Sequence, residues 1–344
     1  MLTWSRLRPG GSLYIMSKRK FNGPIFIVGM PRSGTKLLRE ILNNHSLIAI
    51  SENESHCIPY FYNKFNKIEN FKDKKNFKLL YQYFSETFFF QRLTQKINFI
   101  NEESWYDSIT DFTYSGVIEA FYQSYTQKKN KKIWGDKTPS YLLHMPLLKS
   151  LFPEAKFIHI IRDVRDYCLS IHKAWNKNIF RAAQRWNDSI VKCRKNSKIL
   201  DDTAYLEVKY ENIIDDPEKN IISICKFLNI PYESNMVSLS RVVENMGDAK
   251  NYIGILKKNY GKWENEIKSN KIRKIEKICG SLLKELNYSV SFNGRTKKLS
   301  KIEMAVYQIM DIFNVLKTEF KFENIGQFVE NIKKTSIHRI VNRG

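Results

Sequence analysis

The chain has 344 residues, of which 42% are apolar and 13% aromatic, so its composition allows a sizeable core and excludes a largely disordered protein. Lysine and arginine together number 57 against 35 aspartates and glutamates, which gives a formal net charge of +22. This excess favours an anionic partner such as a nucleotide, a nucleic acid or a membrane surface, although a general lysine- and asparagine-rich residue usage explains it equally well. The sequence contains no stretch of 18 apolar residues, so we predict no membrane-spanning helix.

The cysteine and histidine patterns predict neither disulfides nor a metal site. The cysteines are odd in number, scattered and without a CxxC pair, so we expect small buried residues in a reducing, cytoplasmic compartment: Cys57, Cys168, Cys193, Cys225 and Cys279. The histidines lack metal-ligand spacing, and we expect no metal requirement. Residues 1–20 lack the apolar block of a signal peptide and are expected to be a flexible extension, with Met16 as an alternative start.

The first strong element is a short apolar run at residues 24–28, which predicts a buried strand. A glycine-containing loop follows at residues 29–34. Residues 35–42 then carry apolar side chains at helical spacing. Strand, glycine loop and helix in this order are typical of a phosphate-binding βα unit.

Further strands and helices alternate along the rest of the chain. We expect helices at 141–152 and 166–177, a helix opening at Pro217, and strands at 156–161 and 204–208. The alternation predicts a three-layer α/β domain over residues 21–298 with a central parallel sheet. Residues 60–130 are expected to form a helical insertion, and residues 299–344 a helical appendage with a basic end; the alternative for the appendage is a helix that contacts a partner or a membrane surface.

The glycine loop has the Gly29-x4-Gly34 spacing of a P-loop, whose backbone N–H groups surround phosphate oxygens. A P-loop NTPase needs lysine and then serine or threonine directly after the second glycine. Here Thr35 precedes Lys36, so both groups are out of register for a γ-phosphate and Mg²⁺. The loop therefore favours an anion without a γ-phosphate, with a P-loop kinase or NTPase-like phosphotransferase as the alternative.

Residues 31–38, PRSGTKLL, resemble the 5′-phosphosulfate loop of the sulfotransferases that use 3′-phosphoadenosine 5′-phosphosulfate (PAPS). The resemblance is greatest to the branch that includes tyrosylprotein and bacterial sulfotransferases, and it implies the P-loop-like fold of that family. It further implies that the loop binds the 5′-phosphosulfate end of the nucleotide through Arg32, Ser33, Gly34, Thr35, Lys36 and Leu37.

Residues 157–170 resemble the segment of the same family that binds the 3′-phosphate: a strand ending in Arg162-Asp163, with Ser170 eight residues after the arginine. The chemistry is reasonable without the family. An arginine at the carboxyl end of a strand points into the crevice where open α/β sheets bind ligands, and its guanidinium donates paired hydrogen bonds to phosphate.

Three shorter segments also resemble the family. Lys137, in the segment WGDKTP, would lie near the transferred group, and we expect Asp136 to be its partner. Tyr210, after the third expected strand, would approach the nucleotide. Lys262, in the segment YGKW, would belong to a late loop that closes over the cofactor.

The stretch Glu54-Ser55-His56 resembles the family's Glu-Thr-His segment, in which the glutamate removes the acceptor's proton. Glu54 is therefore the expected base, with Glu52 and His56 as alternatives. Sulfuryl transfer moves a charged group in line between two nucleophilic atoms, so positioning and charge stabilisation dominate. We expect Lys137 and Lys36 to stabilise that charge.

The combined expectation is a sulfotransferase that uses PAPS and a hydroxyl or amine acceptor, with a carbohydrate or glycoconjugate as the first expectation. Residues 60–130 are expected to select this acceptor, because loops and insertions carry specificity on a fixed scaffold. No nucleic-acid-binding module is recognisable, so no specific nucleic-acid partner is expected. We expect a cytoplasmic protein, with peripheral membrane contact through residues 299–344 as an alternative.

Overall fold

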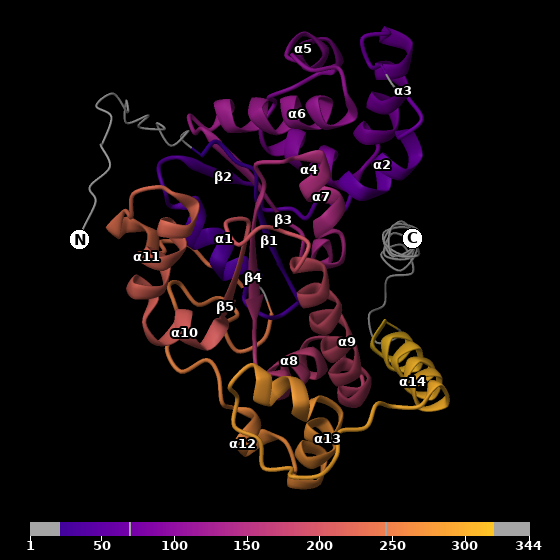
Figure 1. Cartoon of the computed structure of the whole chain (residues 1–344), viewed down its shortest axis with the longest axis vertical. Helices are drawn as coiled ribbons and strands as arrows, with labels where there is room; N and C mark the ends of the chain where they lie inside the picture. The colour runs from indigo at the N-terminus through magenta and orange to yellow at the C-terminus, as the bar shows by residue number, and fades with distance from the viewer. Residues whose placement is uncertain (1–20, 69, 245, 320–344) are drawn as a thin grey trace, which may run out of the picture.

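The structure is a computed structural model that describes residues 21–68, 70–244 and 246–319 (Figure 1). The extension expected at residues 1–20, with the alternative start Met16, lies outside the described residues. So does the basic end of the expected appendage, from residue 320 onward.

A five-stranded sheet forms the centre of the molecule, with strand order β2-β3-β1-β4-β5. Every neighbouring pair is parallel, which confirms the predicted α/β class. Parallel strands direct their carboxyl ends to the same edge, so the segments that follow them meet there. The strands are β1 (Ile25–Gly29), β2 (Ile48–Ile50), β3 (Ile133–Lys137), β4 (Lys156–Ile161) and β5 (Tyr205–Lys209).

Helices cover both faces of the sheet, because alternate residues of each strand point to opposite faces. Phe26 and Val28 of β1 belong to one core, whereas Ile25 and Ile27 belong to the other. The helices that contribute to the smaller core are α1 (Thr35–Asn43), α10 (Tyr210–Asp215) and α11 (Pro217–Leu228), with η2 (Ser234–Val237) beside them. The larger core includes α8 (Val164–Trp175), α9 (Ile179–Ser197) and α13 (Ser269–Glu285).

The single helix expected at residues 141–152 is wrong. The chain forms a 3₁₀ helix, η1 (Pro139–Leu143), and then a separate helix, α7 (Met145–Leu151). Pro146 explains the break, because it has no N–H to donate to the carbonyl four residues earlier and its ring would clash with that carbonyl. Proline is well tolerated in a first helical turn, which is where α7 places it.

The insertion between β2 and β3 is helical, as expected, and occupies the upper part of the view in Figure 1. Its interior is aromatic: the Phe84 ring lies 5.1 Å from Trp105 and 5.0 Å from Phe121. This interior is continuous with the larger core of the sheet. Its helices are α2 (Ile58–Phe65), α3 (Lys74–Ser85), α4 (Phe88–Lys96), α5 (Glu102–Asp107) and α6 (Tyr114–Lys128).

The described chain ends with α12 (Trp263–Glu266), α13 and α14 (Lys301–Glu319), the last lying at the periphery beside α9 (Figure 1). Within the described residues, no helix combines the length and the apolar content needed to cross a membrane. All five cysteines are buried with free thiols, as predicted.

Candidate active site

The predicted site residues gather at the carboxyl edge of the sheet. The glycine loop follows β1, the Arg162 segment follows β4, and Tyr210 follows β5. Glu54 follows β2, and Lys137 is the last residue of β3. Residues distant in sequence are therefore brought together by strand order alone.

The glycine loop turns sharply into α1. Arg32 has φ 70° and Gly34 has φ 93°, both in the left-handed region. A Cβ on Gly34 would lie 2.3 Å from the Tyr210 ring, so only glycine allows this close contact between the loop and α10. Tyr210 is thereby placed against the loop.

The two arginines of the motifs predicted to bind phosphate, Arg32 and Arg162, line one pocket. One terminal nitrogen of Arg162 lies 3.3 Å from the backbone oxygen of Arg32, and the other donates to the Asn259 backbone oxygen at 3.0 Å. The Arg162 guanidinium also lies 4.6 Å from the centre of the Tyr210 ring. Trp186 supports the segment by donating to the Arg162 carbonyl at 3.1 Å.

A carboxylate from a distant segment lies among the cations of the glycine loop. The Glu244 Oε2 atom is 3.0 Å from Arg32 Nη1 and 3.9 Å from Lys36 Nζ. Arg32 also donates to Ser170 Oγ at 3.3 Å, which joins the loop to the predicted 3′-phosphate segment. The cations of the loop are thus placed to bind an anion, and the carboxylate of Glu244 is such an anion within the chain itself.

Two buried donors at this place have no hydrogen-bond partner within the described chain: Ser33 Oγ and Arg162 Nε. Buried polar groups are rarely left unpaired, and such exceptions require an explanation. Their residues are only 0% and 8% exposed. Anionic oxygens from a nucleotide's phosphates are suitable acceptors for both donors, so the residues present fit the implied nucleotide.

The late loop lies against the same pocket. Lys262 Nζ contacts Asp248 Oδ2 at 2.8 Å and Asn259 Oδ1 at 2.9 Å. Asp166 accepts from the backbone N–H groups of Gly261 at 2.6 Å and Trp263 at 3.2 Å. Burial raises the pKa of Asp166, although the charge of Arg162 opposes the shift.

The proposed base is paired with the proposed lysine. Glu54 Oε1 lies 2.5 Å from Lys137 Nζ, and Glu54 Oε2 lies 3.0 Å from His56 Nε2. Burial opposes ionisation of Glu54, but the His56 hydrogen bond and the Lys137 charge more than offset it and lower its pKa to about 2. Burial lowers the pKa of Lys137, whose side chain is 1% exposed, despite the attraction of Glu54. Glu54 is therefore ionised and able to accept a proton.

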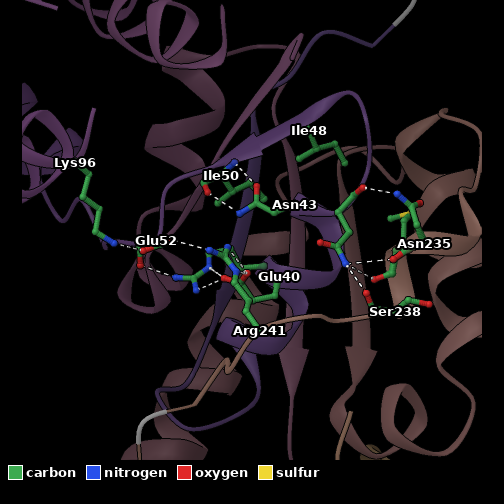
Figure 2. A network of polar contacts seen from close by, with 12 residues as sticks. Glu40, Asn43, Ile48, Ile50, Glu52, Lys96, Asn235, Ser238 and Arg241 are labelled. Atoms are coloured by element: carbon green, nitrogen blue, oxygen red, sulfur yellow. Dashed lines mark hydrogen bonds and ion pairs between the residues drawn. The ribbon is translucent and has the colours of Figure 1, made fainter. Parts of the chain in front are cut away.

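The alternative base Glu52 lies in a separate ion-pair network (Figure 2). Its carboxylate is 2.5 Å from Lys96 Nζ and 2.8 Å from Arg241 Nη1. Arg241 also pairs with Glu40 of α1. The Lys96 hydrogen bond lowers the pKa of Glu52, with burial opposing, so two cations occupy the oxygens that a base would need. The third candidate, His56, is hydrogen-bonded to Glu54, so these two side chains belong to the same site.

The expected pairing of Asp136 with Lys137 is wrong. Asp136 instead accepts from Tyr122 and from Thr138 Oγ1, both at 2.6 Å. Consecutive residues of a strand point to opposite faces, so Asp136 faces the insertion while Lys137 faces Glu54. Burial raises the pKa of Asp136, and its hydrogen bonds oppose that rise.

The sequence did not single out Asn259, Asp166 or Glu244 as pocket residues. Asn259 directly precedes the YGKW segment, and Asp166 lies within the strand-ending motif, so both were next to a signal. Glu244 had none, because nothing local marks a lone carboxylate. Across the described residues, no group of three or more histidine, cysteine, aspartate or glutamate side chains is arranged to hold a metal ion.

Comparison with known proteins identifies the family. The family model described as "Sulfotransferase family" matches residues 24–234, which is more than half of the chain and includes both of the motifs predicted to bind phosphate. The chain belongs to the sulfotransferase family.

Its relatives include enzymes named for different acceptors. A protein-tyrosine sulfotransferase A from Caenorhabditis elegans is 25% identical over 64% of this chain and 53% of its own length. The Mycobacterium bovis omega-hydroxy-beta-dihydromenaquinone-9 sulfotransferase Stf3 is 26% identical over 33% of each chain. The chain therefore spans about half the length of the tyrosine sulfotransferase that it matches.

A solved structure supports the fold. The sulfotransferase domain from the curacin biosynthetic pathway superimposes with a TM-score of 0.53 at 18% identity. The match covers 79% of this chain and 99% of that domain. The overall fold of the chain is thus that of a sulfotransferase domain.

Proposed function

We propose that this protein transfers a sulfuryl group from PAPS to a hydroxyl or amine acceptor. One observation carries the proposal: Arg32 and Arg162, from motifs 130 residues apart, line one pocket, and the Glu54–Lys137 pair lies at the same sheet edge. Ligands of open α/β sheets bind at this edge. The pocket supplies cations for two phosphate groups, and the pair supplies a base and a further cation.

Each group has one role in the reaction. Glu54 takes the proton from the acceptor's O–H or N–H, and the freed electron pair forms a bond to sulfur. The bond between sulfur and the 5′-phosphate oxygen breaks, its electrons remain on that oxygen, and adenosine 3′,5′-bisphosphate leaves. Lys137, Lys36 and Arg32 stabilise the charge that builds on the sulfuryl group and the leaving phosphate.

The Glu54–Lys137 contact couples nucleotide binding to base strength. Lys137 is the buried partner that helps to hold the pKa of Glu54 low. A sulfuryl group that attracts Lys137 weakens that hold, and the basicity of Glu54 then rises. The base is therefore strengthened when the group to be transferred is present.

The acceptor is proposed only as a class. A tyrosine and a hydroxylated menaquinone derivative, named for two relatives, both offer a hydroxyl group. A carbohydrate acceptor and selection of the acceptor by residues 60–130 both remain predictions.

The test is transfer of labelled sulfuryl from PAPS, in EDTA, to a panel of tyrosyl peptides, oligosaccharides and hydroxylated lipids. We expect transfer to at least one acceptor class. Glu54→Gln should lower kcat about 10²- to 10⁴-fold, the usual contribution of a general base, with unchanged affinity for adenosine 3′,5′-bisphosphate. Near-normal turnover by this variant would reject Glu54 as the base, and no nucleotide binding by the unmodified protein would reject the function itself.

A further inference from the structure

Helix α14 is attached to the rest of the molecule through polar side chains. Asp311, which is buried, lies 2.7 Å from Arg181 Nη1 and accepts from the Asn178 backbone N–H at 2.6 Å. Tyr307 accepts from Lys274 Nζ at 2.9 Å. Positions 307 and 311 are four residues apart, so they share the face of α14 that contacts the protein.

The start of α14 is fixed by a reciprocal cap. Ser300 Oγ accepts from the Glu303 backbone N–H at 3.1 Å, and the Glu303 side chain accepts from the Ser300 backbone N–H at 2.9 Å. Such a capping box satisfies two donors that a helix N-terminus otherwise leaves unpaired. The orientation of α14 therefore follows from its own sequence and its docking contacts.

Several apolar side chains in the described part of α14 are exposed. Ile302 is 76% exposed and Phe313 is 60% exposed. Five exposed apolar residues of the helix, beginning with Ile302 and ending with Phe313, follow one another at spacings of four, three, one and three residues. These spacings place all five on one helical stripe. A surface helix normally turns this stripe to the core, and a contiguous exposed apolar patch marks an interaction site. The stripe consists of Ile302, Val306, Ile309, Met310 and Phe313.

A basic segment leads into this stripe. Arg295, Lys297, Lys298 and Lys301 are all exposed, and residues 286–302 contain no acidic residue. Lys298 pairs with Asp188 at 2.9 Å. Cations near a helix N-terminus are unfavourable because they face the positive end of the helix dipole, so helix stability does not explain them.

We propose that α14 and residues 295–301 form a contact surface for an anionic lipid bilayer. The apolar stripe would lie at the boundary between headgroups and acyl chains, while the basic segment binds anionic headgroups. Charge complementarity favours this partner over a second copy of the chain, which would bring a second basic segment of the same sign to the interface. This surface is independent of the proposed sulfuryl transfer.

The test is co-sedimentation of the full chain with phosphatidylcholine vesicles, with and without phosphatidylserine. We expect binding to the phosphatidylserine vesicles that weakens at high salt. The pair of substitutions Ile309→Glu and Phe313→Glu should reduce it more than tenfold, and Lys297→Gln about fivefold. Both glutamates enter at exposed positions, so the fold should survive, which circular dichroism checks.

The chain offers a matched control. Ile199 follows the C-terminal end of α9, whereas α14 contacts the N-terminal end of that helix. It is 74% exposed, close to the 76% of Ile302. Ile199→Glu should leave vesicle binding unchanged. Absence of binding by the unmodified chain, or equal binding by the stripe variant, would overturn the proposal. If the unmodified chain forms a dimer without lipid and the stripe variant is a monomer, the membrane proposal is overturned and the surface binds a second copy of the chain.

Discussion

At the scale of single residues, several cations of the site are paired with carboxylates of the same chain. Arg32 and Lys36 face Glu244, and Lys137 faces Glu54. Buried ion pairs are weak evidence for stability, because the cost of desolvation offsets their attraction, so we relate their arrangement to ligand binding. The two carboxylates have different roles, because Glu54 is the proposed base, whereas Glu244 occupies cations that the nucleotide needs.

Glu244→Gln should therefore strengthen nucleotide binding. The substitution removes a negative charge 3.0 Å from Arg32, and an interaction of about 1 kcal/mol corresponds to roughly a fivefold lower Kd for adenosine 3′,5′-bisphosphate. Isothermal titration calorimetry measures the change. Weaker binding by the variant would mean that Glu244 positions Arg32 for the ligand instead of competing with it.

His56→Ala should shift the acid side of the pH–rate profile upward. A base works only when deprotonated, so kcat/KM falls as the pH drops through the pKa of the free enzyme's Glu54. That pKa is about 2, and the His56 hydrogen bond is the largest contribution that lowers it. Loss of the bond raises the pKa, so the variant should lose activity at a higher pH than the unmodified protein. Superimposable acid limbs would contradict this role of His56.

At the scale of elements, the strand–loop–helix unit from residue 25 to residue 43 and the strand at 156–161 could be predicted, because each follows a simple pattern. β2 could not, since three residues carry too little periodicity. β3 could not either, because its sequence IWGDK contains a glycine and two charged residues but is fully buried. Only glycine fits at position 135, because a Cβ there would lie 2.7 Å from the Ile25 carbonyl oxygen.

The same limit applies to the site. The residues at the carboxyl ends of β1 and β4 could be foreseen, because parallel strands place them at one edge. The segment that carries Glu244 and Asn259 could not, because its path depends on tertiary contacts such as the Arg162 bond to the Asn259 carbonyl. Local sequence specifies no such contact.

The late loop depends on α8 for its position, which gives a prediction at this scale. Asp166→Ala removes two hydrogen bonds to the loop that carries Lys262, and bonds to a charged group contribute about 1.5–3 kcal/mol each. Most of this loss falls on the loop itself, so we expect a roughly tenfold weaker affinity for adenosine 3′,5′-bisphosphate, which corresponds to about 1.4 kcal/mol, with Asp166→Asn intermediate. Asp201→Ala, at a residue paired with Lys149 on the surface, is the control and should bind normally. Unchanged affinity in Asp166→Ala would show that the loop holds its place without this carboxylate.

At the scale of the whole molecule, a buried charge cluster joins the end of β4 to α13. Arg165 lies 2.6 Å from Asp163 and 2.8 Å from Glu276, and all three side chains are nearly inaccessible. Glu276 also accepts from Ser291 Oγ at 2.7 Å, which ties in the segment that leads to α14. Removing Glu276 would leave Arg165 paired with Asp163, but it would take away the acceptor of Arg165 Nη1, of Ser291 N–H and Oγ, and of Phe292 N–H.

Glu276→Ala should therefore lower the free energy of unfolding by about 3–5 kcal/mol, because each buried donor left without an acceptor costs about 1–3 kcal/mol. The matched control is Glu285→Ala on the same helix, where the carboxylate is 63% exposed and pairs with Arg194; it should cost less than about 1 kcal/mol. Urea denaturation followed by circular dichroism measures both. Equal losses in the two variants would contradict a special role for burial.

We propose that the segments after β1 and β4 bind the two ends of one doubly phosphorylated adenosine without a divalent metal. Calorimetric titration of adenosine 3′,5′-bisphosphate in EDTA tests it most directly, with the unmodified chain, Arg32→Ala and Arg162→Ala compared. We predict binding by the unmodified chain and a loss of more than tenfold in affinity for each variant. Binding that requires Mg²⁺, or a Kd within twofold of the unmodified value in either variant, would contradict it.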